Sequence, residues 1–418
     1  MSGRADGTAM RPIRKTIPFA EALGIVREAA RPLDRAVAVG LPDAAGSVLA
    51  EDVVAGGDVP PFDRAAMDGY AVVAADTFGA GRQEPARLHC IESIHSGMVS
   101  TRRLGAGECI QIATGAPLPD GADAVVMVEE TARDGDAVRV LSPVHPRQHV
   151  GRRGADIEAG RTLLRRGDLL TPSRVGSIAA LGAAEVSVYD RPRVGLVSTG
   201  NEIVEPGRPL RAGQIYDINR FTLGAVVAEH GGVPVPHPIT ADSLPALGAA
   251  VDDIIAQGTD ILVFSGGSSV GERDLTLDVM RQKGSVAFHG IAVKPGKPTA
   301  FGHIGATPVL GMPGYPTSCL SNAYLLLVPF LRRVARLPPH RVRTVTVPAA
   351  HRFVSTPGRH QFYTVRIVDG LAVGAFKASG DITSMSQADG YVEIPLRTDV
   401  IEEGEPVEVA LFGPGAPA

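Results

Sequence analysis

Two glycine-rich stretches between residues 260 and 318 decide the fold of this chain. Residues 261–274 read ILVFSGGSSVGERD, and residues 307–318 read TPVLGMPGYPTS. In each, an apolar run typical of a buried strand ends in glycine, and a helical pattern follows, from Leu275 and from Cys319. Residues 294–298, between the two, read KPGKP. Glycine-rich strand ends and a pair of lysines predict a pocket for an anionic ligand at the carboxyl edge of a parallel sheet.

Strands and helices alternate around these stretches, which predicts a doubly wound, mostly parallel sheet. The expected strands are 194–197, 233–235 and 261–264, and the expected helices are 219–230 and 244–257. Right-handed crossovers place the loops after parallel strands along one edge. We therefore expect 198–202, 265–274 and 312–318 to share that edge.

The remaining segments predict a multidomain α/β protein with three further domains around the central domain at 187–337. Closely spaced alternation of apolar and polar residues predicts a β-rich second domain at 53–144, and short strands predict a small, β-barrel-like domain at 338–418. Residues 15–52 and 145–186 each carry a helical pattern. We expect these two helices to pack together in a discontinuous helical extension domain.

Composition excludes several classes of protein. The 418 residues are 44% hydrophobic and 21% charged, with a net charge of −4, which argues against a nucleic-acid-binding protein. No apolar run reaches the roughly 18 residues that a membrane span needs. The three cysteines, Cys90, Cys109 and Cys319, are far apart and form no zinc motif. We therefore expect a reduced, cytoplasmic protein that does not bind a membrane.

The glycine-rich loop and the lysines predict how an anion is held. The backbone N–H groups of Gly266, Gly267 and Ser268 are candidates to line a phosphate, because residues without large side chains allow close approach. Lys294 and Lys297 are candidate point charges against phosphate or another oxyanion. The alternative for the KPGKP loop is a surface turn with solvated lysines. No nucleotide-binding fingerprint is present.

Three carboxylates are expected at or near strand ends on the same edge: Glu202, Asp242 and Asp274. Oxygen ligands in that number beside a phosphate site suit Mg²⁺. The alternative is helix capping for Asp242 and Asp274, since both precede helical patterns. Two further residues, Asp68 in an Asp-Gly turn and Thr114 in a Thr-Gly turn, read on their own as turn residues. No arrangement for a Ser, His or Cys nucleophile is apparent.

Seven motifs occur in an order that resembles one known family. They are PFD with AMDGYA at 61–71, TGAP at 114–117, STGNE at 198–202, GQIYD at 213–217, SGG with Asp274 at 265–274, KPGKP at 294–298 and PGYP at 313–316. The chain resembles the MoeA family of molybdopterin molybdenumtransferases, and also the C-terminal region of gephyrin, from about residue 17 to about residue 411. Each motif alone is weak, but their common order makes the resemblance specific.

The resemblance implies an activity and its substrates. It implies a homodimer of four-domain subunits with a molybdopterin-binding α/β domain. Molybdate would be inserted into adenylylated molybdopterin in an Mg²⁺-dependent step that releases AMP. The molybdopterin adenylyltransferase would be a possible partner.

The resemblance also implies roles for individual residues. The three carboxylates would be acidic site residues and metal ligands, and the two lysines would bind anions. Asp68 and Thr114 would face the pocket from the partner subunit. Pro313 and Pro316 would shape the pocket, and Ser384 matches a substrate-binding serine of the family.

The family pattern is not matched everywhere, and other functions stay open. Asn201 stands where the family commonly has Asp, and Tyr315 stands where it has Asn. One alternative function is adenylylation of molybdopterin, because related α/β domains perform that step. Another is a non-enzymatic scaffold of the gephyrin type.

Overall fold

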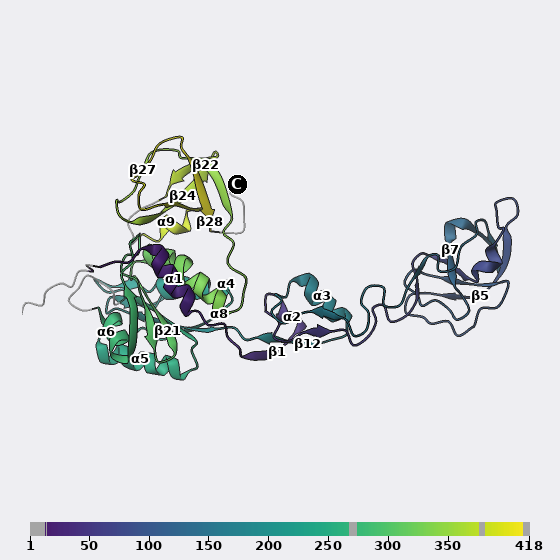
Figure 1. Cartoon of the computed structure of the whole chain (residues 1–418), viewed down its shortest axis with the longest axis horizontal. Helices are drawn as coiled ribbons and strands as arrows, with labels where there is room; N and C mark the ends of the chain where they lie inside the picture. Colours follow the sequence, from purple (N-terminus) through teal and green to yellow (C-terminus); the bar gives the residue numbers. More distant parts are fainter. Residues whose placement is uncertain (1–12, 14, 267–273, 376–380, 413–418) are drawn as a thin grey trace, which may run out of the picture. The chain divides into compact units, whose positions relative to one another are not determined.

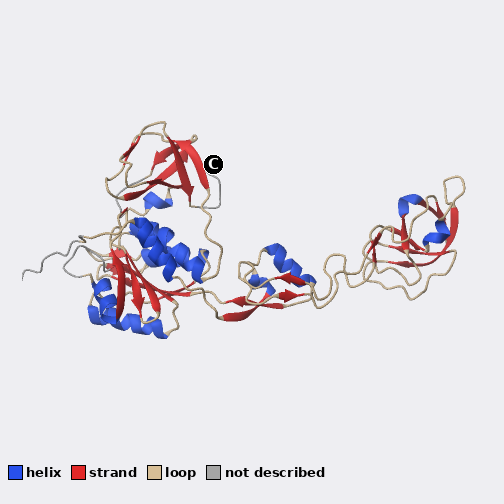
Figure 2. Ribbon diagram, viewed as in Figure 1, coloured by secondary structure: helices blue, strands red, loops and turns tan. Residues whose placement is uncertain are grey.

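The computed structural model describes Ile13 and residues 15–266, 274–375 and 381–412. The chain divides into two compact units, which are both drawn in Figures 1 and 2. The first unit comprises Met1–Val37, Gly46–Val48 and Tyr189–Ala418, and the second comprises Ala38–Ala45 and Leu49–Val188. Within the described residues, no helix combines the length and the apolar character needed to cross a bilayer.

A six-stranded sheet forms the centre of the first unit, as predicted. Its strand order is β16 (Val233–Pro236), β13 (Arg193–Thr199), β17 (Ile261–Gly266), β21 (Thr307–Met312), β20 (Ala300–Ile304) and β18 (Gly284–His289). The first four strands are parallel, whereas β20 is antiparallel to both of its neighbours. Two reversals make β18 run in the same direction as β21. The carboxyl ends of β13, β17, β21 and β18 therefore lie at one edge.

Helices cover both faces of this sheet (Figure 1). On one face lie α5 (Leu244–Ala256) and α6 (Leu275–Lys283), and on the other lie α1 (Phe19–Ala29), α4 (Asn219–Glu229), α7 (Pro316–Asn322) and α8 (Val328–Val334). Each face has its own buried apolar core. The apolar side chains of these cores supply most of the favourable free energy of folding, at about 1.5–3 kcal/mol for each large side chain buried.

Helix α1 belongs to the α/β domain, so the predicted start of the extension domain at residue 15 is wrong. Ala22 and Val26 on α1 are fully buried in the same core as Leu331 on α8. The first helix and the helix that begins after Thr171 thus belong to different compact units. Pro18 occupies the N-cap position of α1, and no side chain caps the helix.

The long helix expected after Cys319 is continuous but irregular. Between α7 and α8, Ala323–Leu327 form a π-helix. Pro329 lies two residues after the end of this π-helix and has no N–H to donate, and its ring crowds the carbonyl group of residue 325. A wider turn ahead of the proline accommodates this clash.

The C-terminal domain is a second sheet in the first unit. It contains β22 (Thr344–Pro348), β24 (His360–Val368), β26 (Gly390–Ile394) and β28 (Pro406–Leu411), and β19 (Val293–Lys294) adds a parallel edge strand. Lys294 is paired with Gln361 of β24. The backbone that carries the first predicted lysine is therefore fixed to the C-terminal domain.

The second unit contains a β-rich sheet and a small helical region. The sheet has the order β7 (Ala124–Met127), β4 (Gly69–Val72), β6 (Glu108–Ile112), β5 (Ala86–Ile94), β9 (Ala137–Val140) and β8 (Thr131–Asp134). The helical region holds α2 (Leu41–Ala44) and α3 (Pro172–Ala180), which share a core with Leu49 and Val188. Thr171 caps α3 by accepting a hydrogen bond from the Arg174 amide, as its position before Pro172 predicts.

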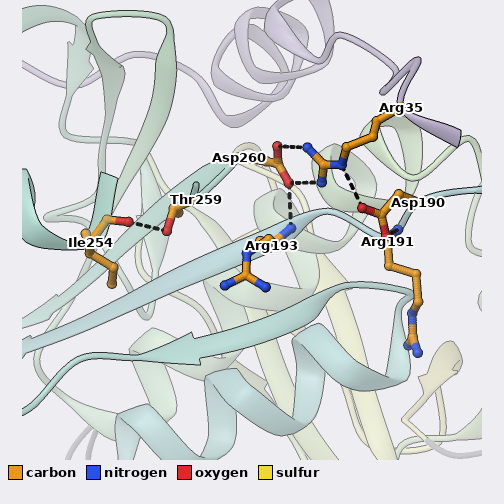
Figure 3. Close-up of polar contacts among 7 residues, drawn as sticks. All are labelled: Arg35, Asp190, Arg191, Arg193, Ile254, Thr259 and Asp260. Atoms are coloured by element: carbon orange, nitrogen blue, oxygen red, sulfur yellow. Dashed lines mark hydrogen bonds and ion pairs between the residues drawn. The ribbon is translucent and has the colours of Figure 1, made fainter. Parts of the chain in front are cut away.

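Arg35 lies close to the point where the chain leaves the first unit, and it binds Asp190, which lies close to the point where the chain re-enters it (Figure 3). Arg35 Nε donates to Asp190 Oδ2 at 2.6 Å, and its two Nη atoms donate to the two oxygens of Asp260 at 3.2 and 3.1 Å. Asp260 Oδ2 also accepts from the Arg193 amide at 2.8 Å. Hydrogen bonds to Asp260 and Asp190 raise the pKa of the Arg35 guanidinium. The start of β13 is thereby held beside residue 35.

Replacing Arg35 by alanine should loosen this junction. The side chain is 44% exposed, so solvent screening limits the loss to about 1 kcal/mol. Hydrogen exchange of a peptide containing the Arg193 amide should therefore become about five-fold faster. Arg35→Lys should recover little, because lysine cannot bridge two carboxylates with a planar fork. Arg191→Ala, which removes only contacts of 3.5 Å, is the matched control. Unchanged exchange in Arg35→Ala would contradict this role.

Candidate active site

The ends of β13 and β17 lie in close contact at the carboxyl edge of the α/β sheet. Ser198 Oγ and Ser265 Oγ are 3.2 Å apart, and both side chains are buried. Gly266 has φ +91°, and a Cβ at this position would lie 2.3 Å from the carbonyl oxygen of Thr199. Only glycine fits such an approach without displacing the backbone. The predicted meeting of these two strand ends is confirmed.

Glu202 and Asp242 both lie against the loop that follows β13. Thr199 Oγ1 donates to Asp242 Oδ1 at 3.3 Å, and the Asp242 amide donates to Asn201 Oδ1 at 3.2 Å. The two carboxylate oxygens of Glu202 would each lie 2.8 Å from a Cβ on Gly200, so this carboxylate rests on the glycine backbone. Both acids are exposed. The side chain of Asn201 thus holds the backbone of Asp242.

Asp274 caps helix α6, whereas Asp242 caps no helix. Asp274 Oδ1 accepts from the Leu277 amide at 3.0 Å. The cap of α5 is Ser243, whose hydroxyl accepts from the Ala246 amide at 3.4 Å, so capping by Asp242 was the wrong alternative.

Asp274 has a partner that the sequence did not indicate. His289 Nε2, at the end of β18, lies 3.0 Å from Asp274 Oδ2. No motif marks His289, and only the direction of β18 brings it to this edge.

The three predicted metal ligands do not form one cluster in the described part of the chain. There, no group of three or more His, Cys, Asp or Glu side chains is arranged to hold a metal ion. Glu202 and Asp242 both lie against the loop that follows β13, and Asp274 lies against His289. Two carboxylates still suit Mg²⁺ when substrate phosphate oxygens and water complete the shell.

The KPGKP loop leaves the sheet at the same edge. His289, the last residue of β18, pairs with Ala300, and Ala300 pairs with Gly311 near the end of β21. Lys294 Nζ donates to Thr356 Oγ1 at 2.7 Å, and Lys297 Nζ donates to the Ile13 carbonyl at 2.9 Å. Both side chains are partly exposed.

A buried asparagine that the sequence did not reveal fixes the lysine loop. Asn322 Nδ2, on α7, donates to the Gly296 carbonyl at 2.9 Å and to Thr299 Oγ1 at 2.6 Å. Gly296 has φ +105°, and a Cβ there would lie 2.3 Å from the same nitrogen. The loop between the lysines is therefore held by α7 as well as by its prolines.

The loop from Pro313 to Pro316 packs onto the strand ends. A Cβ on Gly314 would lie 3.5 Å from the Cα of Gly266. The Gly314 carbonyl accepts from Asn219 Nδ2 at 2.8 Å. Pro313 is buried, and Pro316 occupies the first turn of α7. Pocket shaping by the two prolines stays a prediction.

Ser384 lies behind this loop and is only 1% exposed. Its hydroxyl donates to the Asp381 carbonyl at 2.9 Å and lies 3.2 Å from Thr317 Oγ1. These contacts hold the C-terminal domain against α7, so they favour support of the loop over direct contact with substrate. The remaining predicted substrate-binding residues of this edge, Gly267 and Ser268, lie outside the described residues.

In the second unit, Asp68 and Thr114 form a pair. Asp68 Oδ1 accepts from the Thr114 amide at 2.7 Å and from Thr114 Oγ1 at 3.0 Å. These hydrogen bonds, with the backbone amide contributing most, lower the pKa of the Asp68 carboxyl below its ordinary value. Both residues are exposed. The sequence suggested each as a turn residue, and the structure joins them into one ionised, outward-facing group.

Three family models match the chain. The MoeA N-terminal region (domain I and II) matches residues 17–182, a probable molybdopterin binding domain matches 195–333, and the MoeA C-terminal region (domain IV) matches 346–412.

Curated relatives and solved structures agree with these matches. "Molybdopterin molybdenumtransferase 2" of Mycobacterium tuberculosis is 37% identical over 385 residues, which are 88% of this chain and 92% of the relative. "Molybdopterin molybdenumtransferase" of Haemophilus influenzae is 32% identical over 381 residues, which are 89% and 93% of the two chains. A crystal structure of the molybdopterin biosynthesis moeA protein from Pyrococcus horikosii matches with a TM-score of 0.83 at 40% identity and covers 96% of this chain and 100% of that one. The chain therefore belongs to the MoeA family.

Proposed function

We propose that this protein is a molybdopterin molybdenumtransferase, which inserts molybdate into adenylylated molybdopterin with release of AMP. The observation that supports this most is the composition of one sheet edge in a MoeA family chain. Three kinds of group lie at that edge: the glycine at the end of β17, the carboxylates of Glu202 and Asp242, and the loop that carries the two lysines. Adenylylated molybdopterin carries a pterin phosphate and a phosphoanhydride, and molybdate is an oxyanion. Binding both substrates needs cationic groups, backbone N–H donors and carboxylates that can hold a metal ion.

The lysine loop suits the anionic parts of the two substrates. Lys294 and Lys297 are compact positive charges on a loop held by Asn322. Lys294 Nζ donates to the Thr356 hydroxyl, and Lys297 Nζ donates to the Ile13 carbonyl. We assign to them the binding of phosphate and molybdate oxygens, and to the Gly266 amide at the end of β17 a further contact to phosphate.

Glu202 and Asp242 are the residues that would hold Mg²⁺, together with substrate oxygens. The ion would offset negative charge on the phosphoanhydride as AMP leaves. Glu202 and Asp242 would also fix the direction of the leaving phosphate, because both rest on the tight turn after β13. Asp274 supports this edge through its cap on α6 and its contact with His289.

We further propose a homodimer in which Asp68 and Thr114 serve the site of the partner subunit. Exposed apolar side chains flank this pair, with Phe62 40% and Met67 43% exposed. Apolar side chains beside an ionised group suit a surface that is covered in the working enzyme. We place the reaction in the cytoplasm, where an adenylyltransferase would supply the adenylylated substrate.

A molybdenum-insertion assay with purified adenylylated molybdopterin, molybdate and Mg²⁺ tests the proposal. The protein alone should produce molybdenum cofactor and AMP in equal amounts. Asp242→Ala and Lys294→Ala should each lower the rate by about 100-fold or more while the protein stays folded, because a charged group assigned to the metal or the substrate is lost. Accumulation of adenylylated product from molybdopterin and ATP, without any insertion, would instead identify an adenylyltransferase.

The shared site has its own test in mixed subunits. Asp68→Ala and Asp242→Ala, each inactive alone, should regain about a quarter of wild-type activity when equal amounts are unfolded and refolded together. Half of the dimers are then mixed, and each mixed dimer has one intact site. Failure to recover activity in verified mixed dimers would place both residues in sites of a single chain.

The ionised state of Asp68 should depend on Thr114. Thr114→Val removes the hydroxyl donor but keeps the amide, so the pKa of Asp68 should rise while staying below its ordinary value. Carbon NMR of the Asp68 carboxyl during an acid titration measures this. Thr114→Ser retains the hydroxyl and should leave the pKa nearly unchanged. An equal pKa in the Val variant would show that the hydroxyl plays no part.

A further inference from the structure

Two of the three cysteines are neighbours in the core of the β-rich domain. Cys90 on β5 and Cys109 on β6 are direct partners in the register of these parallel strands. Adjacent strands lie about 4.8 Å apart, within the range of Cα separations that a disulfide spans. Both side chains belong to the same buried cluster, on one face of the sheet.

The two thiols contact each other and differ in access to solvent. Burial, together with a hydrogen bond to Cys90, raises the pKa of the Cys109 thiol to about 12. Cys90 is 7% exposed, whereas Cys109 is fully buried. Cys90 Sγ also donates to the Glu92 carbonyl at 3.4 Å, and the strand register shifts between Cys90 and Glu92.

Neither thiol has a role in the proposed transfer of molybdenum. Cys109 lies on β6, which ends two residues before Thr114, but its side chain points into the core and not toward Asp68. The third cysteine, Cys319, is buried alone in the α/β core. The chain thus carries one pair of cysteines and one isolated cysteine.

We propose that Cys90 and Cys109 are a modification site, at which a small-molecule disulfide such as oxidised glutathione closes an intramolecular disulfide bond. The Cys90 thiolate attacks the reagent and releases one thiol, leaving a mixed disulfide on Cys90. Cys109 then attacks the Cys90 sulfur, releases the second thiol, and completes the bond. The two protein thiols lose two electrons and two protons, and the reagent gains both.

The test compares thiol counts before and after equilibration of the folded protein with excess oxidised glutathione. Unfolding in denaturant and titration of free thiols should give three before oxidation and one afterwards. The intact mass should fall by about 2 Da, and a peptide map should join the segments that contain Cys90 and Cys109. Wild-type protein suffices for this measurement, so it does not depend on the folding of any variant.

Cysteine variants distinguish a disulfide between Cys90 and Cys109 from the independent reaction of single thiols with glutathione. Cys319→Ala should lose both of its remaining thiols with no added mass. Cys90→Ala and Cys109→Ala should form no internal bond. Three free thiols after oxidation would overturn the proposal, and so would a gain in mass from bound glutathione or a bond that involves Cys319.

Discussion

The alignment of parallel strands in the α/β sheet is the constraint on which the rest of the structure depends. Thr199 pairs with Gly266, and Ser265 pairs with Met312, so β13, β17 and β21 end at the same level. β20 is antiparallel to both β21 and β18, so β18 runs in the same direction as β21. His289, at the end of β18, and the lysine loop therefore lie at this edge as well. The described segments that follow these strands, although far apart in the sequence, therefore meet at one edge of the sheet.

Close packing of small residues at this rim gives the loops fixed positions. Gly266 lies against Thr199, Gly314 lies against Gly266, and Gly296 lies against Asn322. A side chain at the first or third of these glycines would collide with neighbouring atoms, so the loops have little freedom to shift. Buried hydroxyl pairs, such as Ser198 with Ser265, satisfy polar groups that would otherwise be costly to bury. A rim of this kind holds charged side chains in place before any substrate arrives.

Much of the fold could be predicted from the sequence, because strand and helix periods and glycine-rich strand ends are local signals. Features that depend on tertiary contacts were missed. Helix α1 has an apolar face that fits either domain, and only packing against Leu331 places it with the α/β core. Pro329 signals an irregular helix, although the apolar pattern around it predicts a uniform one.

The candidate site, too, has features that the sequence predicted and features that it did not. Motif order located the strand-end loops and the pair of Asp68 and Thr114, which the structure joins by two hydrogen bonds. A single cluster of three carboxylates was expected from their common edge, but the described residues hold no such group arranged for a metal ion, and Asp274 lies against His289. Asn322 and His289 act through side chains that meet loops far away in the chain, and no local pattern marks such contacts.

A soak of protein crystals with tungstate, a heavy analogue of molybdate, tests most directly whether this rim binds an oxyanion. The account predicts one strong anomalous peak within about 3 Å of donor atoms of Lys294, Lys297 or the Gly266 amide. It also predicts that the peak is lost in Lys294→Ala crystals. Tungstate bound only at arginines away from the sheet edge, or absent from a lysine loop open to solvent, would contradict it.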